Sequence, residues 1–189
     1  VFLEGEGWDG IEIPSGGRLE LMNAAFSGCS ACIEAEGGLL EATAVTLKGS
    51  EGIGVSTAND SPFELIDLSI SGFNGGIVIK GGKGRIEKCN ITGNGVGLAF
   101  LGGNGEIVNN NIDDNRDLEI NAGSKLVLDR NYLGADNIND LKLKGDFLVA
   151  GLLNAPYPKG SNVVLVDRKD VTPETVAAQF EEQKANGIA

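Results

Sequence analysis

The residues of this chain that are best suited to chemistry form one charged cluster near its middle. The cluster consists of Asp113, Asp114, Arg116, Asp117 and Glu119. Calcium binds oxygen ligands that converge from several side chains, which makes Asp113, Asp114 and Asp117 candidate metal ligands. Alternate residues of an extended chain point to opposite sides, so only one or two of these carboxylates should face any one point. We therefore expect no tight metal site and no cofactor, and we expect Arg116 to form a surface ion pair with Asp136.

Other residue types that often carry chemistry are scarce. The chain has no His and only three Cys, which are Cys29, Cys32 and Cys89. Three cysteines are too few for a disulfide framework, and Cys29 and Cys32 have no second CxxC with which to complete a zinc site. We interpret all three as buried structural thiols. A local disulfide between Cys29 and Cys32, or metal or redox chemistry at this pair, are the alternatives.

A sequence repeat must position these groups. The sequence GRIEKCNITGNGVGLAF, which begins at Gly84, returns as GEIVNNNIDDNRDLEI, which begins at Gly105. Within it, Ile86 returns as Ile107, and the later positions match at an offset of about 20 or 21 residues. Self-similarity at such a period indicates a solenoid.

Three sets of apolar residues recur at this period, and each set predicts one strand per coil. The first set consists of pairs two residues apart, as in a strand, namely Ile11/Ile13, Ile33/Ala35, Ile53/Val55, Ile77/Ile79, Leu98/Phe100, Leu118/Ile120 and Leu141/Leu143. The second set is Leu21, Ala42, Leu65, Ile86, Ile107 and Val127, and the third is Phe26, Leu47, Ile70, Ile91, Ile112 and Tyr132. Stacked at the roughly 4.8 Å spacing of neighbouring strands, these segments predict a rod of about six or seven coils. Both ends of such a rod need to be covered.

Polar residues recur at the same period. Asn90, Asn111 and Asn131 precede residues of the third set and should hydrogen-bond through their amides as a ladder. Two outward columns flank the second set. The first column is Glu20, Glu41, Glu64, Arg85, Glu106 and Leu126, and the second is Met22, Thr43, Ile66, Glu87, Val108 and Leu128. The first column places Arg85 between two carboxylates. The second is partly apolar, which suits a face that another subunit, domain or loop covers.

Two other repeat classes fit less well. Leucine-rich repeats need a Leu-dominated LxxLxLxxN pattern, whereas Ile, Val and Gly lead here. The nonapeptide calcium-binding repeat begins with Gly-Gly-x-Gly-x-Asp. Residues 81–84 and 102–105 match its start, but Ile86 and Ile107 occupy the Asp position. The sequence therefore excludes calcium bound in that manner.

The regular pattern ends at Tyr132, and the remaining chain should cover the last coil and then either dock on the rod or lead into a further domain. Residues 146–155 are apolar enough to cover the last coil, and residues 163–166 are a candidate strand. Thr172, Pro173 and Glu174 suit the first turn of a helix over about 173–186. The apolar face of that helix consists of Val176, Ala177 and Phe180. We therefore divide the chain into a parallel β-helix over residues 1–155 and a C-terminal extension over residues 156–189. Because the chain begins abruptly with VFLEG, we interpret it as a piece of a longer or processed protein.

The overall composition excludes several partners. The net charge of −12 makes nucleic acid and anionic membrane surfaces poor partners. No apolar run is long enough to span a bilayer. The apolar fraction of 41% is sufficient for a core, which argues against a disordered chain.

The recurring Ile-x-x-x-Asn-Ile-x-x-Asn-x-x-Gly pattern, clearest over residues 86–100 and 107–120, resembles the right-handed parallel β-helix superfamily with its pectate-lyase-like fold. The run Asn131-Tyr132-Leu133-Gly134 is similar to the Asn-Tyr-Trp-Gly box of the carbohydrate-binding and sugar-hydrolase branch, with Leu133 where Trp is usual. The resemblance covers about residues 5–145. It implies an all-β fold, a right-handed single-stranded parallel β-helix. It also implies a secreted, periplasmic or cell-surface protein whose partners are polysaccharide or other domains of its parent protein.

The resemblance implies an activity only where the motif residues are present. Polygalacturonase-like members use Asn-Thr-Asp, Asp-Asp, Gly-His-Gly and Arg-Ile-Lys motifs. This chain has only Asp113-Asp114, and residues 85–87 read Arg-Ile-Glu. Alginate-epimerase-like members also need a His, which the chain lacks. A pectate-lyase-like mechanism needs calcium-binding carboxylates and an Arg or Lys base, for which Arg116 is the candidate catalytic residue.

Taken with the missing motifs, the sequence favours a protein that is not an enzyme. We expect a non-catalytic β-helix scaffold or binding module of an exported or cell-surface protein. A carbohydrate-binding module and a calcium-dependent polysaccharide lyase are the alternatives.

Overall fold

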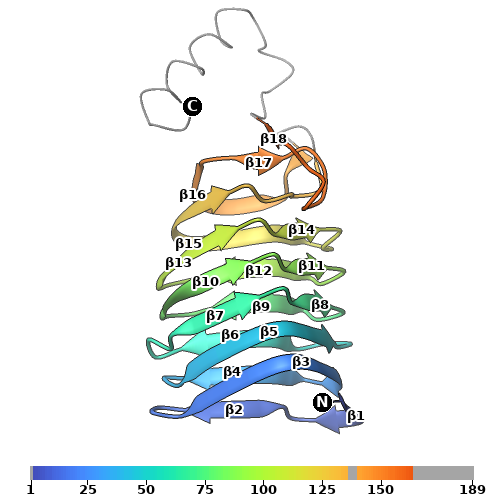
Figure 1. The fold of residues 1–189 in the computed structure, drawn as a ribbon, viewed down its shortest axis with the longest axis vertical. Coiled ribbons are helices and arrows are strands. Elements are labelled where there is room, and N and C mark those ends of the chain that lie inside the picture. Colours follow the sequence, from blue (N-terminus) through green and yellow to red (C-terminus); the bar gives the residue numbers. More distant parts are fainter. Residues whose placement is uncertain (1, 136–139, 164–189) are drawn as a thin grey trace, which may run out of the picture.

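The computed structural model describes residues 2–135 and 140–163, which wind into a rod of stacked coils (Figure 1). Each regular coil consists of three short strands joined by corners. The strands pair in parallel with strands one coil before and one coil after, and they form one continuous sheet around the rod. The all-β parallel β-helix predicted from the repeat is confirmed in the described residues, which include no α-helix.

We call the three sides of the rod the first, second and third face, in chain order. The first face contains β2 (Ile11–Pro14), β4 (Ala31–Glu36), β6 (Ile53–Ala58), β9 (Gly75–Ile79), β12 (Val96–Phe100) and the start of β15 (Leu118–Asp129). The second face contains the starts of β3 (Arg18–Cys29) and β5 (Leu39–Lys48), then β7 (Phe63–Ile66), β10 (Lys83–Glu87), β13 (Asn104–Val108) and the ends of β15 and β16 (Leu143–Val149). The third face contains β1 (Phe2–Trp8), the ends of β3 and β5, β8 (Ser69–Ser71), β11 (Asn90–Thr92) and β14 (Asn111–Asp113).

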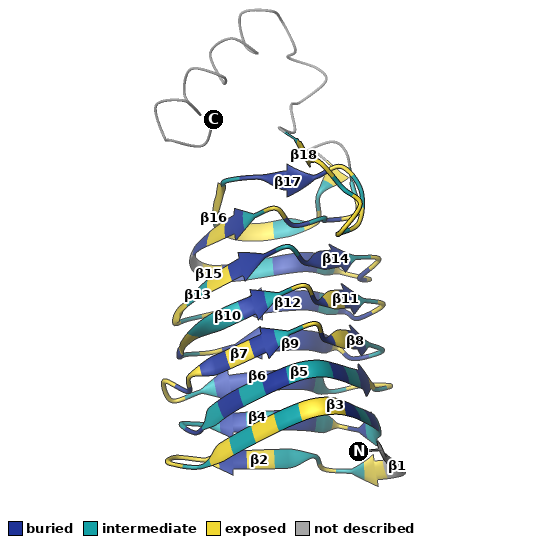
Figure 2. Ribbon diagram, in the orientation of Figure 1, coloured by how far each residue is buried: buried dark blue, intermediate teal, exposed yellow. Residues whose placement is uncertain are grey.

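The core consists of aliphatic side chains stacked from coil to coil. Register-paired residues of parallel strands point to the same side of a sheet, so the pairing identifies the stacks. The stacks on the first, second and third faces include Val55–Ile77–Leu98–Ile120, Leu65–Ile86–Ile107–Leu128 and Leu47–Ile70–Ile91–Ile112. None of these residues is more than 1% exposed, and Figure 2 shows the buried positions recurring along the strands. The predicted stacking of Ile86 on Ile107 and of Ile91 on Ile112 is confirmed.

One corner of the coil has the same backbone conformation in every turn. The residue between the second and third strands has a positive φ of 50–58° in six successive coils, at Asn23, Ala44, Asp67, Lys88, Asn109 and Arg130. Left-handed backbone disfavours residues with a Cβ by roughly 1–2 kcal/mol, although Asn and Asp tolerate it better. Its recurrence at Ala44, Lys88 and Arg130 shows that the stacked strands on both sides determine this corner more than the residue type does.

The predicted register is wrong on the second face of the coil formed by β15. Ile107 pairs with Leu128, and Val127, expected in the core, is 44% exposed. The neighbouring positions move by one residue as well. Leu126, expected outward, is buried, and Asp129 takes the place expected for Leu128 above Val108. Leu126, Val127 and Leu128 are all apolar, so strand alternation could not choose between the two registers.

The same one-residue error affects the third face. Tyr132 pairs with Asn111, and Leu133 rather than Tyr132 is the buried residue above Ile112. Asn131 consequently lies outside the column of Asn90 and Asn111. This correction changes the predicted amide ladder, as described below.

On the first face, three predicted pairings are displaced by two residues. Val55 rather than Ile53 pairs with both Ile33 and Ile77. Leu98 pairs with Ile120 rather than with Leu118. A shift of two keeps every side chain on its side of the strand. The hydrophobic pattern therefore could not detect it.

Residues 146–155, expected to cover the last coil, instead extend the rod. Strand β16 pairs with β15 along the first and second faces, and β17 (Leu152–Leu153) follows with a bridge to Asn131. Strand β18 (Asn162–Val163) then pairs antiparallel with β17. The rest of the strand expected over 163–166, the expected helix over 173–186 and Asp136 lie outside the described residues.

The three cysteines differ in oxidation state. Cys29 and Cys32 form a disulfide across the corner between β3 and β4, with their Cα atoms 5.1 Å apart, so the interpretation of these two as thiols is wrong. Because the corner turns the chain from one face of the coil to the next within three residues, the two side chains come into the range of disulfide geometry. Cys89 is a buried free thiol, as expected, and burial raises its pKa to about 12. In the described part of the chain, no helix is long and apolar enough to cross a membrane.

Candidate functional site

The charged cluster predicted from the sequence lies at the corner between β14 and β15. Asp113 is half-buried, and burial together with the charge of Asp114 raises the pKa of its carboxyl group. The exposed Arg116 places its Nε 3.8 Å from Oδ2 of its neighbour Asp117. Within residues 2–135 and 140–163, no three His, Cys, Asp or Glu side chains converge as they would around a metal ion. The corner thus does not bring Asp113, Asp114 and Asp117 to one point.

Glu119 has a role that the sequence analysis did not assign. Its side chain is buried, and Oε2 accepts hydrogen bonds from the backbone N (3.4 Å) and the Nδ2 (2.5 Å) of Asn115. The Lys142 ammonium lies 3.7 Å from Oε1 and donates to the backbone O of Asn115 at 2.6 Å. Burial raises the pKa of the Glu119 carboxyl group, while the Asn115 hydrogen bonds and the Lys142 charge oppose that rise.

Glu119 ends an internal ladder of amide side chains at the corner after the third face. The Oδ1 of Asn94 accepts from the backbone N of Phe73 at 3.1 Å, and the Oδ1 of Asn115 accepts from the backbone N and the Nδ2 of Asn94 at 3.1 Å each. Asn94 and Asn115 also donate to the carbonyls of Ile70 and Ile91. The Glu119 carboxylate accepts from Asn115 where the next amide of the ladder would stand.

Glycines make room for this ladder. A Cβ at Gly97 would lie 2.6 Å from Nδ2 of Asn115, and a Cβ at Gly76 would lie 3.1 Å from Nδ2 of Asn94. In the next coil this position is occupied by Glu119, whose side chain supplies the acceptor itself. The spacing of Asn94 and Gly97 was visible in the sequence, but it does not recur in the next coil, where Leu118 follows Asn115 at that spacing.

A second internal ladder lies at the corner after the second face. The Oδ1 of Asn110 accepts from the backbone N of Cys89 at 2.9 Å, and the Oδ1 of Asn131 accepts from the backbone N and the Nδ2 of Asn110 at 3.0 Å each. Both amides also donate inward, to the carbonyls of Ile86 and Ile107. Asn131 therefore belongs to this ladder with Asn110, and not to the predicted column of Asn90 and Asn111.

The predicted contact between Asn90 and Asn111 does form, on the outer side of the third face. The Nδ2 of Asn111 donates to Oδ1 of Asn90 at 2.6 Å. The Asn111 amide also binds the backbone of Tyr157: its Oδ1 accepts from the N at 2.6 Å, and its Nδ2 donates to the O at 3.2 Å. The loop between β17 and β18 is thus anchored to the side of the rod.

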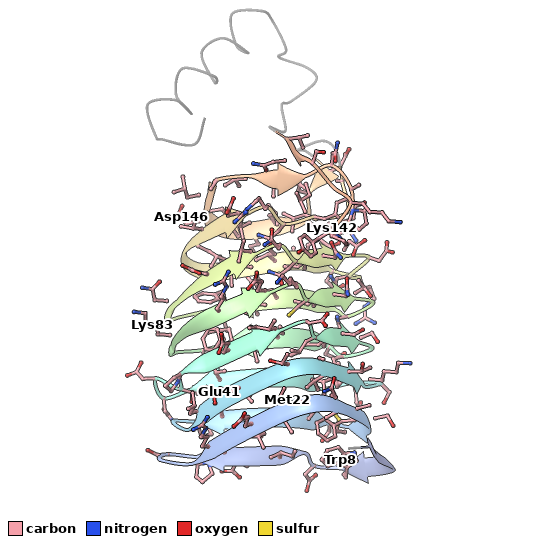
Figure 3. The ribbon with its side chains drawn as sticks, viewed as in Figure 1. Trp8, Met22, Glu41, Lys83, Lys142 and Asp146 are labelled. Carbon is pink, nitrogen blue, oxygen red and sulfur yellow. A yellow bond between two sulfur atoms is a disulfide. The ribbon has the colours of Figure 1, made fainter. Side chains whose placement is uncertain are left out.

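An open concave surface lies on the second face, and we call it the second-face groove. It has a volume of about 700 Å³ and crosses β5, β7, β10 and β13. Its polar lining side chains are Glu41, Glu64, Lys83, Arg85, Asn104 and Glu106, of which Figure 3 labels Glu41 and Lys83. A second hollow of about 490 Å³ shares Arg85, Asn104 and Glu106 with it and continues toward Val127 and Arg130.

One half of this lining could be predicted from the sequence pattern, whereas the other half was not predicted. The outward column Glu41, Glu64, Arg85 and Glu106 is confirmed by the strand pairing. The residues two positions earlier, including Lys83 and Asn104, form a parallel column on the same side. Alternation along a strand puts residues i and i+2 on one face, and this was the available signal.

Ion pairs within the column neutralise part of its charge. Arg18 contacts Oε2 of Glu41 at 2.7 Å and of Glu20 at 3.4 Å. Arg85 Nε lies 3.1 Å from Glu87 and 3.8 Å from Glu106, although it has no well-aligned hydrogen bond among the described residues.

Glu64 and Lys83 line the groove and form no ion pair within the described part of the chain. Such a surface can donate and accept hydrogen bonds along a hydroxyl-rich ligand.

Comparison with known proteins supports the fold. A family described as the right handed beta helix region matches residues 51–137. No curated protein and no solved structure matches the chain. The matched residues include β7, β10 and β13 of the second-face groove and the charged corner after β14, and the match agrees with the predicted resemblance.

Proposed function

We propose that this chain, a right-handed parallel β-helix, is a non-catalytic scaffold and binding module of an exported or cell-surface protein. The observation that supports this function is the second-face groove. It is an open concave surface on a rigid rod, and fixed carboxylates, cations and an amide line it. Strand positions hold side chains more exactly than loops do, which suits recognition of an extended ligand.

The carboxyl groups whose pKa is raised in the described residues lie away from this groove. Proton transfer needs an acid or base within hydrogen-bond reach of the substrate. Among the described residues, the two carboxyl groups with a raised pKa are Asp113 and Glu119, which lie at the corner between β14 and β15 and do not line the groove. Glu119 is also engaged by Asn115 and Lys142. This separation supports binding rather than catalysis.

The ligand class that fits best is a neutral polysaccharide. The net charge of −12 opposes the approach of a polyuronate. The lining instead offers both hydrogen-bond donors, at Lys83, Arg85 and Asn104, and acceptors, at Glu41, Glu64 and Glu106. A sugar hydroxyl group can accept a hydrogen bond from these donors or donate one to these acceptors. A carbohydrate-binding module is therefore the more specific form of this proposal.

Location outside the reducing cytosol is part of the proposal. Disulfides persist in oxidising compartments and are rare in cytosolic proteins. The disulfide between Cys29 and Cys32 supports an exported or cell-surface protein. Retention of the disulfide in protein recovered from its native source, measured by thiol alkylation and mass spectrometry, would test this part independently.

Binding is tested with a panel of neutral, acidic and cationic polysaccharides. We expect the protein to bind neutral polysaccharide and the Arg85→Ala and Glu64→Gln variants to bind at least about fivefold more weakly. Glu12→Gln is the matched control, since it removes one exposed carboxylate from the first face, away from the groove.

Equal binding by Glu64→Gln, Arg85→Ala and the control would contradict the groove assignment. Release of unsaturated uronides from pectate or alginate, lost in Arg116→Ala, would establish the lyase instead.

A further inference from the structure

The C-terminal end of the hydrophobic core is open in the described residues. Strand β16 places Leu143, Phe147 and Val149 directly above Ile120, Leu126 and Leu128. The three lower residues are buried, at 0%, 2% and 0% exposure. Of the three upper residues, Leu143 and Phe147 are only half-buried and Val149 is 38% exposed. These residues point inward, but no further coil lies above them within residues 2–135 and 140–163.

The N-terminal end of the rod differs on its third face only, because Ile11, Leu19 and Leu21 of the first coil are also half-buried. The Trp8 ring packs against Phe26 with centroids 5.9 Å apart, and its Nε1 donates to the carbonyl of Ser27 at 2.9 Å. Trp8 thus provides an aromatic cover for the first coil, on the third face (Figure 3). At the C-terminal end, the hairpin of β17 and β18 buries Leu152 and Leu153, but it leaves Val149 exposed.

We propose that residues 164–189 cover this open end and that Val176, Ala177 and Phe180 lie over Leu143, Phe147 and Val149. The first support is where the chain leaves the rod. Val163 pairs with Leu152, which lies only three residues after Val149. Residues 164–172, if extended, reach at most about 30 Å, which is ample to return over the last coil.

The second support is the pattern of the segment itself. The sequence predicts a helix over 173–186 with Val176, Ala177 and Phe180 on one face. Acidic and amide side chains occupy other positions, at Glu174, Gln179, Glu181, Glu182 and Gln183. A helix with one apolar face must bury it against another element, and the end of a solenoid needs a cover with a polar outer surface. The segment meets both requirements at once.

The experiment measures how fast a cysteine placed at the open end reacts with a soluble thiol reagent. Cys29 and Cys32 are bonded to each other and Cys89 is buried, so Val149→Cys adds the one readily accessible thiol in the described residues. The reference is Met22→Cys, on the second face near the other end, where Met22 is 64% exposed. We expect Val149→Cys in the full chain to react at least about tenfold more slowly than the reference, as for a site exposed only by local opening.

The segment is then perturbed on its apolar face. Phe180→Asp should remove the protection of Val149→Cys, and Phe180→Ala should reduce it. Gln179→Asp, which adds the same charge one residue away, should leave it intact. The Met22→Cys rate and the number of reactive thiols in each background report whether the rod remains folded, because unfolding would also expose Cys89.

Three results would overturn the proposal. One is a Val149→Cys rate equal to that of the reference in the unperturbed full chain. Another is protection that survives both Phe180 substitutions. The third is protection that increases with protein concentration, which would assign the cover to a second copy of the chain.

Discussion

At the residue scale, buried asparagines act as extensions of the backbone hydrogen-bond network. Asn110 is fully buried, accepts from the backbone N of Cys89, and donates to the carbonyl of Ile86 and to Oδ1 of Asn131. Backbone groups at corners cannot all pair within strands, and an unpaired buried group is costly. The amide side chains supply hydrogen-bond partners for these backbone groups at two corners of the rod.

Replacing Asn110 by Ala should therefore destabilise the fold strongly. The change leaves the N–H of Cys89 and the carbonyl of Ile86 without these partners, which should lower the free energy of unfolding by about 2–4 kcal/mol. Asn90→Ala is the matched control, because Asn90 is exposed and makes its amide contact on the outer side; it should cost less than about 1 kcal/mol. Chemical denaturation of both variants measures the difference, and equal losses would contradict the role of the internal ladder.

Glu119 should make stability depend on pH. Because burial raises its folded-state pKa above the ordinary value of 4.5, the fold favours the protonated carboxyl group. Its contribution to stability is then fully present below pH 4.5 and is lost as the pH rises through the raised folded-state pKa. Glu119→Gln keeps a neutral side chain at all pH values. Relative to the unchanged protein, this variant should gain stability as the pH is raised from 4 to 7.

The measurement is a series of thermal melts between pH 4 and pH 7. Asp117→Asn, which neutralises a carboxylate that is 63% exposed, is the control and should show a smaller pH-dependent difference. A difference between Glu119→Gln and the unchanged protein that is constant across this range would show that Glu119 is not the group responsible.

The roles of some of these residues could be predicted from the sequence, and the roles of others could not. The 21-residue offset correctly placed Asn90 next to Asn111. It assigned Asn131 to the wrong column because residues 109–111 are all Asn, and any of the three could continue the repeat. Glu119 was read as part of a surface cluster, since burial of a carboxylate depends on Asn115 and Lys142, which the fold brings together. The disulfide depended likewise on the local corner geometry of Cys29 and Cys32.

At the scale of the element, the fold was easier to predict than the register of individual strands. Stacked strands repeat the same positions in every coil. Spacing alone was therefore enough to predict the buried core positions Ile86, Ile91, Ile107 and Ile112. Strand β15 contains three consecutive apolar residues, Leu126, Val127 and Leu128, whereas strict alternation would place a polar residue next to each apolar one. Its pairing with β16 is also interrupted between Ala122 and Leu126. The contacts with β13 decide that Leu126 and Leu128, and not Val127, face inward.

Two substitutions in β15 distinguish the observed register from the one predicted by the sequence. Leu128 is fully buried above Ile107, whereas Val127 is 44% exposed. Leu128→Ala should cost about 2–5 kcal/mol in stability, as for other truncations of buried aliphatic residues. Val127→Ala should change it by less than about 0.5 kcal/mol, as at exposed sites. Urea unfolding of both variants gives the comparison, and a larger loss for Val127→Ala would restore the predicted register.

At the scale of the whole molecule, the rod is a one-dimensional stack. Each coil packs almost entirely against the coil before and the coil after it, as the sheet order shows. Stability in such a structure is close to a sum of contributions from each coil and each interface. An inner coil has two interfaces, whereas a terminal coil has one. Opening should therefore begin at the two ends and move toward the middle.

Amide hydrogen exchange should show this gradient along the rod. We expect the amides of β8, β9, β11 and β12 to exchange most slowly, because these strands pair with a strand on both sides. The amides of β2, which pairs only with β4 among the described strands, should exchange at least about tenfold faster, since fraying ends open at lower free energy than the core. Exchange resolved by peptide and mass spectrometry measures both sets. Equal protection in β2 and β11 would mean that the rod opens as one cooperative unit, and the nearest-neighbour description would then be wrong.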